Sequence, residues 1–124
     1  MNILVIEDEK FILDSMAKAL RGEGYTVITA EDQETAMEHI QSKKLDMVIS
    51  DVMLPYSGGF DIVDFIRQDP LKKHIPVILV TGMDADILKT TRTEANVCLP
   101  KPFSSLQLTT LVNKFLNEKV TETN

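Results

Sequence analysis

Carboxylate, hydroxyl and ammonium side chains stand at or close to the ends of apolar segments of this chain. These side chains belong to Glu7, Asp8, Asp51, Thr81 and Lys101. If the apolar segments are strands of one parallel sheet, their carboxyl ends lie along the same edge and bring the polar side chains together. The sequence therefore predicts a single polar site assembled from distant parts of the chain.

Three carboxylates in one site predict a bound cation. At an effective dielectric constant near 20, two carboxylates about 5 Å apart repel each other by roughly 3 kcal/mol. A small hard cation with oxygen ligands offsets that repulsion, and Mg²⁺, which retains several waters, is the expected one. The candidate side-chain ligands are Glu7, Asp8 and Asp51.

Lys101 and Thr81 add a positive charge and a hydroxyl donor to the same site. A phosphoryl group held against a metal ion requires such partners for its oxygens. Since a carboxylate can accept a phosphoryl group and form an acyl phosphate, Asp51 is the candidate nucleophile. We therefore expect Mg²⁺-dependent phosphoryl transfer, with Asp51, Thr81 and Lys101 as its catalytic residues.

Short apolar runs rich in Val and Ile alternate with segments of helical periodicity. The runs cover residues 3–6, 25–29, 47–49, 77–80 and 97–99, and the expected helices lie around residues 11–20, 36–40, 60–66, 85–93 and 108–116. Continuous apolar runs suit strands that are buried on both faces of a parallel sheet. The β-α alternation predicts an α/β doubly wound sheet, with any site at the carboxyl ends of its strands.

Residues typical of helix ends support these boundaries. Asp32 is a plausible N-cap of the second helix, and Ser104-Ser105 lies where the last helix should begin. Gly22 or Gly24 should stop the first helix, and Asp69-Pro70 the third.

Composition excludes several classes of function. The chain has 124 residues, enough for one domain, and no apolar run approaches the roughly 18 residues of a membrane span. Its start lacks the features of a signal peptide, and the single cysteine cannot form an internal disulfide. A net charge of -6 argues against direct nucleic-acid binding. We expect a soluble cytoplasmic protein whose partners are other proteins or a cation.

Four motifs give the chain a resemblance to the receiver domains of two-component response regulators. They cover residues 3–8, 51–55 with Gly58-Gly59, 75–81 and 101–103. Each is weak alone, but the four in this order and spacing span nearly the whole chain. The resemblance implies a flavodoxin-like, CheY-like (βα)5 fold, a five-stranded parallel sheet of strand order 2-1-3-4-5. It also implies a receiver domain over residues 1–120 and a C-terminal tail at 121–124.

The same resemblance implies roles for individual residues. Asp51 resembles the phosphoacceptor, Asp8 a direct Mg²⁺ ligand and Glu7 a ligand through water, with the backbone carbonyl of Met53 as a further ligand. Thr81 and Lys101 would contact the phosphoryl group. The bond from Lys101 to Pro102 is expected to be cis.

The partners implied are a sensor histidine kinase or a histidine phosphotransfer protein as the phosphoryl donor. A downstream protein or an output domain would read the phosphorylated state. The protein would catalyse only its own phosphorylation and dephosphorylation, so it would not be an enzyme in the ordinary sense. It is expected to be a monomer or a weak, phosphorylation-dependent dimer.

The chain departs from the family pattern at several positions. Cys98 stands where an aromatic switch residue is usual, and it is expected to be a packed residue rather than a redox sensor. Asn96 and Val97 replace two acidic residues, which weakens the case for a charged dimer face. Met53 and Met83, at positions that tune loss of the phosphoryl group, cannot orient an attacking water, so slow self-dephosphorylation is expected.

Two other functions are open from the sequence alone. A haloacid dehalogenase type of phosphohydrolase also uses an Asp nucleophile and Mg²⁺, but it carries a second Asp two residues later, where this chain has Met53. A degenerate receiver would bind its partners constitutively, without phosphorylation. The missing aromatic at Cys98 is the feature that supports this second alternative.

Overall fold

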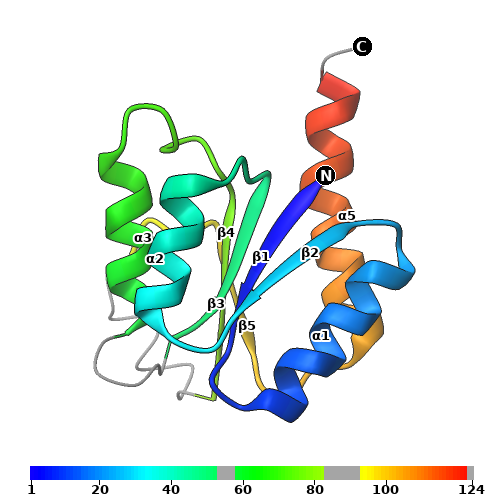
Figure 1. Ribbon diagram of the computed structural model, residues 1–124. Coiled ribbons are helices and arrows are strands. Elements are labelled where there is room, and N and C mark those ends of the chain that lie inside the picture. Colours follow the sequence, from blue (N-terminus) through cyan, green and yellow to red (C-terminus); the bar gives the residue numbers. More distant parts are fainter. Residues whose placement is uncertain (53–57, 83–92, 123–124) are drawn as a thin grey trace.

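A computed structural model describes residues 1–52, 58–82 and 93–122 of the chain. A five-stranded parallel sheet of order β2-β1-β3-β4-β5 lies between two layers of helices. In Figure 1, α2 and α3 cover one face of the sheet, and α1 and α5 cover the other. The doubly wound fold and its strand order are therefore confirmed.

The five strands match the apolar runs closely. Their bounds are β1 (Asn2–Ile6), β2 (Thr26–Ala30), β3 (Met47–Asp51), β4 (Val77–Thr81) and β5 (Val97–Pro100). The strands β3 and β4 run further than the sequence predicts, so Asp51 and Thr81 are their last residues rather than the residues that follow them. The sheet therefore fixes the backbone of both residues.

The core has two halves because successive side chains of a strand point to opposite faces. In β1, Leu4 and Ile6 pack toward α2 and α3, whereas Ile3 and Val5 pack toward α1 and α5. All four are fully buried. This two-sided burial explains why β1, β3 and β4 are continuous apolar runs instead of alternating ones.

Four helices lie within the described residues: α1 (Lys10–Gly22), α2 (Gln33–Ser42), α3 (Gly59–Gln68) and α5 (Ser105–Glu122). In the helix expected over 85–93, residues 85–92 lie outside the described part of the chain, and Thr93 is not helical. Among the helices that are described, none is long and apolar enough to cross a membrane. The domain boundary predicted after residue 120 remains a prediction, and α5 continues past it to Glu122.

The predicted helix ends are confirmed. The carboxylate of Asp32 accepts a hydrogen bond from the Thr35 N–H at 2.7 Å and so caps α2. Before α5, the Gln107 N–H donates to Ser104 Oγ at 3.0 Å, and the Ser104 N–H donates to Gln107 Oε1 at 2.7 Å. This reciprocal pair is a capping box, and it fixes the start of α5 close behind Lys101.

Candidate functional site

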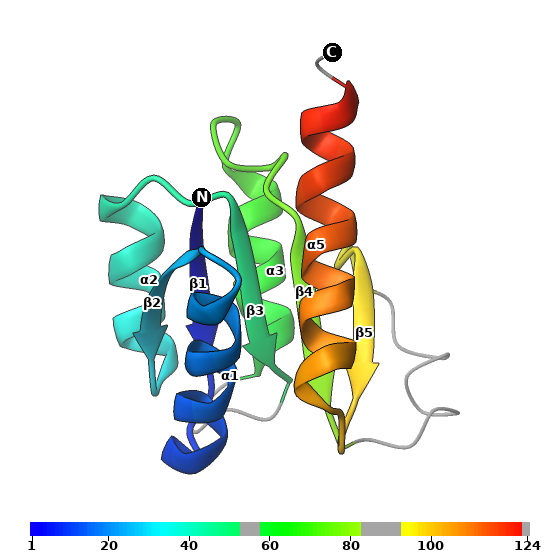
Figure 2. The same ribbon diagram turned by 90° about the vertical axis from the view of Figure 1, so that its right-hand side faces the viewer.

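The carboxyl ends of the parallel strands lie along one edge of the sheet, the lower edge in Figure 2, toward which the arrowheads point. In the register of the sheet, Ile6 pairs with Ser50, Asp51 with Val80, and Thr81 with Pro100. The predicted site residues therefore lie at or just after the ends of adjacent strands. The strand order reverses between β1 and β3, and open α/β sheets bind ligands at such a switch point.

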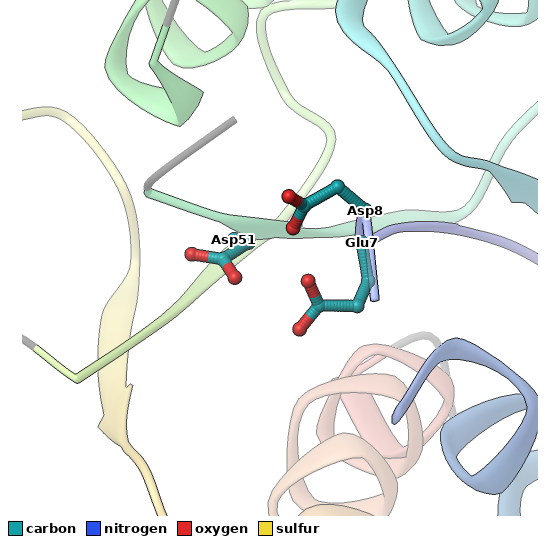
Figure 3. Close-up of side chains that lie close together, drawn as sticks. All are labelled: Glu7, Asp8 and Asp51. Atoms are coloured by element: carbon teal, nitrogen blue, oxygen red, sulfur yellow. The ribbon is translucent and has the colours of Figure 1, made fainter. Parts of the chain in front are cut away.

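Glu7, Asp8 and Asp51 bring their carboxylates together at this edge. Figure 3 shows the three side chains converging, and one oxygen from each lies within 4.8 Å of the others. Glu7 is fully buried and Asp51 is 4% exposed, whereas Asp8 is exposed. Two buried carboxylates and one that is open to solvent fit Mg²⁺, because this ion takes oxygen ligands and keeps part of its water shell. Met53, predicted as a further ligand, lies outside the described residues.

Lys101 reaches two of these carboxylates at once. Its ammonium donates to Glu7 Oε1 and to Asp51 Oδ2, each at 2.6 Å. At 4.8 Å, the separation that bounds the cluster, two carboxylates repel each other by roughly 3 kcal/mol at an effective dielectric constant of 20. The bridging ammonium offsets that repulsion, so Lys101 is part of what allows the acidic cluster to be buried.

The protonation properties of the site follow from this burial. Burial raises the pKa of Glu7 to about 7, and the neighbouring Asp51 and Asp8 add to the rise while the bond from Lys101 opposes it. Burial alone would lower the pKa of Lys101, but the hydrogen bonds to Asp51 and Glu7 outweigh it and raise that pKa. Lys101 therefore stays charged at neutral pH.

Thr81 is fully buried at the end of β4. Its carbonyl oxygen accepts a hydrogen bond from the Lys101 N–H at 2.7 Å, so the two residues predicted to contact a phosphoryl group are linked through the main chain. The peptide bond between Lys101 and Pro102 is cis, as expected.

Two further residues, neither of which was predicted to belong to the site, lie against the backbone of Asp51. Ser50 is fully buried and donates its hydroxyl to the Asp51 carbonyl at 2.9 Å. Gly59 begins α3 directly against the same carbonyl. The signals in the sequence were a polar residue inside an apolar strand and a glycine pair before a helix.

An apolar hollow of about 490 Å³ lies beside Lys101, between the start of α1 and the start of α5. Its lining residues include Phe11, Ile12, Met16, Phe103 and Leu108. Phe11 is 84% exposed. The surface next to the acidic site is therefore apolar rather than charged.

The residues that depart from the family pattern have internal contacts. Cys98 is half-buried, packs against the core on the α3 side of the sheet, and has its pKa raised by burial. The side-chain oxygen of Asn96 accepts hydrogen bonds from Arg67 and from the Val77 N–H, each at 2.8 Å. Both residues contribute to packing within the domain.

Comparison with known families gives one match over most of the chain. A family profile described as "Response regulator receiver domain" matches residues 3–113.

Two curated relatives show how much of a longer protein this chain resembles. The alkaline phosphatase synthesis transcriptional regulatory protein PhoP of Bacillus subtilis is 34% identical over 92% of this chain and 48% of its own length. The regulatory protein VanR of Enterococcus faecium is 35% identical over 86% of this chain and 46% of its own length. The chain thus spans about half the length of the curated relatives it matches.

Solved structures resemble the fold over nearly their full length. The chemotaxis response regulator CheY4 of Vibrio cholerae superposes with a TM-score of 0.85 at 28% identity, over 91% of this chain and 96% of that one. The response regulator protein TrrA of Thermotoga maritima, solved in complex with Mg²⁺-BeF, gives a TM-score of 0.81 at 31% identity, over the same shares of 91% and 96%.

Proposed function

The chain belongs to the receiver-domain family of response regulators, and from this premise we propose that it is a phosphorylation-controlled switch whose phosphoacceptor is Asp51. The observation that carries the proposal is the bridge from Lys101 to Asp51 and Glu7 within a cluster of three carboxylates. A nucleophilic carboxylate, a fixed ammonium and oxygen ligands for a metal are the parts that phosphoryl transfer to Asp requires.

In the proposed reaction, a carboxylate oxygen of Asp51 attacks the phosphorus of a phosphohistidine. A new O–P bond forms, the P–N bond breaks, and its electron pair stays on the imidazole, which takes up a proton. Asp51 becomes an acyl phosphate. Lys101 already contacts Asp51 Oδ2, so it is placed to neutralise charge on the incoming group, and Thr81 supplies a hydroxyl donor at the end of the next strand.

Glu7, Asp8 and Asp51 would hold Mg²⁺ together with the main-chain carbonyl proposed for Met53. When bound, the metal would neutralise negative charge on the transferring group. The Mg²⁺-BeF complex of the relative from Thermotoga maritima supports this part of the proposal.

The phosphoryl donor that we propose is a sensor histidine kinase or a histidine phosphotransfer protein. The apolar hollow beside Lys101, with the exposed Phe11 at its rim, supports a protein donor, because apolar surface next to the acceptor offers a contact that a small anion would not use. The proposed location is the cytoplasm, as for other response regulators.

Phosphorylation would change the interactions of Lys101 first. The added charge on Asp51 would compete with Glu7 for the ammonium, and the Lys101 N–H links that change to Thr81 and β4. We propose that a surface of the domain changes its conformation on phosphorylation, and that a downstream protein or an output domain binds one of its two forms. The chain would act only on itself, as a monomer or a weak, phosphorylation-dependent dimer.

The test is incubation with phosphoramidate or acetyl phosphate and Mg²⁺, followed by intact-mass measurement. We expect the gain of one phosphoryl group, its loss on treatment with hydroxylamine, which cleaves acyl phosphates, and no gain in the presence of EDTA. Asp51→Asn should abolish the gain, whereas Asp64→Asn, the same change at an exposed position of α3, should not. Absence of any gain in the unmodified chain would favour a degenerate receiver, and steady hydrolysis of a generic phosphomonoester would favour a phosphohydrolase.

A further inference from the structure

We propose that Ser50 and Gly59 are positioning residues for Asp51, which hold the end of β3 against the start of α3 and so set the rate of phosphoryl transfer. This inference rests on the proposed role of Asp51 as the phosphoacceptor. Gly59 has no side chain, and the Ser50 hydroxyl bonds to a main-chain carbonyl. They act on the main chain that carries the carboxylate.

Ser50 is a fully buried hydroxyl in the middle of an apolar sheet. The two residues before it in β3, Val48 and Ile49, are buried aliphatic residues. A buried hydroxyl costs free energy unless it is hydrogen-bonded. Here the hydroxyl donates to the Asp51 carbonyl oxygen at 2.9 Å, so the stabilising contact of Ser50 is made to the residue that carries the nucleophile.

Gly59 is required for space rather than for an unusual backbone conformation. Among the described glycines, only Gly24 has a positive φ. A Cβ at Gly59 would overlap the carbonyl oxygen of Asp51, and it would lie 3.0 Å from Ser50 Oγ and 3.1 Å from the Asp51 carbonyl carbon. Any side chain at Gly59 must therefore push either α3 or the Asp51 peptide out of place.

The same helix start is bonded to the strand end. The Gly59 N–H donates to the Val52 carbonyl at 2.9 Å, immediately after Asp51. The Asp51 peptide is thus held between the Ser50 hydroxyl and the first turn of α3, while Lys101 holds its carboxylate at 2.6 Å. Because both its main chain and its carboxylate oxygen are held, Asp51 has a defined position before a phosphoryl donor arrives.

Position matters because phosphoryl transfer requires the attacking oxygen to lie in line with the bond that breaks. A misplacement of about 1 Å can slow such a reaction on the order of a hundredfold. Loss of the Ser50 hydroxyl removes one of the contacts on the Asp51 peptide, and a side chain at Gly59 displaces it directly. Both changes should slow transfer without altering any group that contacts the donor.

The experiment compares Ser50→Ala and Gly59→Ala with two matched controls, Ser42→Ala and Gly22→Ala. The Ser42 hydroxyl bonds to the Glu38 carbonyl at 2.8 Å on the exposed end of α2, and a Cβ at Gly22 would meet nothing within 4 Å. For each protein, the limiting rate of phosphorylation by phosphoramidate with Mg²⁺ is measured separately from the donor concentration at half-maximal rate. In this step the P–N bond breaks, the bond from Asp51 to phosphorus forms, and ammonia leaves. Urea unfolding gives the folded fraction.

We expect Ser50→Ala to lower the limiting rate per folded molecule about tenfold, with the half-saturating donor concentration unchanged. Gly59→Ala should lower it further, and the two controls should react at the rate of the unmodified chain. Should Gly59→Ala fail to fold, Ser50→Ala still decides the question. Variants that lose stability but react at the unmodified rate would overturn the inference and leave these residues with a structural role only. An unmodified chain that takes up no phosphoryl group would overturn the phosphoacceptor assignment as well, so the two failures are distinct.

Discussion

The ammonium of Lys101 lies 2.6 Å from Asp51 Oδ2, although 50 positions separate the two residues in the chain. The same ammonium lies 2.6 Å from Glu7 Oε1, 94 positions away. The Lys101 ammonium thus links the residue after β1 to the last residue of β3 at the carboxyl edge of the sheet. Lys101 therefore has two roles, since it stabilises a buried acidic cluster and it holds the proposed nucleophile.

Lys101→Met separates the effect of the ammonium on Mg²⁺ binding from its effect on phosphoryl transfer. Removal of the ammonium takes away a positive charge that repels Mg²⁺, so we expect Mg²⁺ to bind at least about threefold more tightly. Phosphorylation by phosphoramidate should nevertheless slow by about a hundredfold or more, because the ammonium no longer neutralises the transferring group. Titration calorimetry and intact-mass kinetics measure the two effects. Lys44→Met, at an exposed position, is the control, and weaker Mg²⁺ binding by Lys101→Met would contradict the argument.

Mg²⁺ should stabilise the folded chain through Asp8. At ten times its dissociation constant, a ligand that binds only the folded state adds about 1.4 kcal/mol to the free energy of unfolding. Asp8 is the exposed carboxylate of the cluster, and the bonds of Lys101 to Glu7 and Asp51 do not involve it. Asp8→Asn should therefore remove most of the Mg²⁺-dependent increase, and in EDTA it should raise stability, because it relieves the repulsion from the neighbouring carboxylates.

The measurement is urea unfolding with Mg²⁺ or with EDTA, above the pKa of Glu7 of about 7, so that this carboxyl is mostly ionised. Asp64→Asn, with the same loss of charge on α3, should respond to Mg²⁺ as the unmodified chain does. A full response to Mg²⁺ in Asp8→Asn would exclude Asp8 as a ligand.

The sheet and the meeting of the site residues could be predicted because both follow from local patterns. Runs such as residues 3–6 and 77–80 have the composition of doubly buried strands, and parallel strands place their last residues at one edge. The contacts of Lys101 with Glu7 and Asp51 could not be predicted, since they depend on one side-chain conformation among many. The residues 53–57 and 83–92 lie outside the described structure, so the role of Met53 remains a prediction.

Asn96 illustrates a second limit of the sequence. Compared with the family pattern it reads as a missing acidic residue, but its side-chain oxygen accepts from Arg67 and from the Val77 N–H. Arg67 also donates to the carbonyls of Lys73, Ile75 and Glu94. Glu94 and Asn96 lie 27 and 29 positions from Arg67 in the chain, and only the packing of α3 against the sheet brings them together.

Asn96→Ala should therefore destabilise the domain. It removes the acceptor of a backbone N–H and of one guanidinium donor, and because Asn96 is exposed and water replaces part of the lost bonding, the expected cost is about 1 kcal/mol in the free energy of unfolding. Asn96→Asp keeps an oxygen acceptor at the same place and should be close to the unmodified chain. Urea unfolding of both variants provides the comparison. Equal stability of Asn96→Ala and the unmodified chain would show that these bonds contribute nothing.

Cys98 should react slowly with alkylating reagents in the folded protein. Burial raises the pKa of its thiol above the ordinary value of 9.0, and only the thiolate is a strong nucleophile. The folded state therefore disfavours the thiolate, and the alkylation rate should level off only above that ordinary value. At about pH 8, alkylation by iodoacetamide should be roughly tenfold slower than in denaturing urea. Rapid alkylation of the folded chain at neutral pH would instead favour a redox role.

The phosphorylated chain should lose its phosphoryl group slowly. Hydrolysis of the acyl phosphate needs a water held in line with the phosphorus, and the family positions that could hold it carry Met53 and Met83, whose thioethers are poor hydrogen-bond partners. Both lie outside the described residues, so this expectation rests on the sequence. We expect a lifetime of minutes or longer in Mg²⁺ buffer, followed by intact mass after removal of the donor. Met53→Asn offers an amide to the water and should shorten the lifetime on the order of tenfold, whereas Met53→Leu should not. Decay of the unmodified phosphoprotein within seconds, without a phosphatase, would contradict the prediction, because the water would then be oriented by some other group.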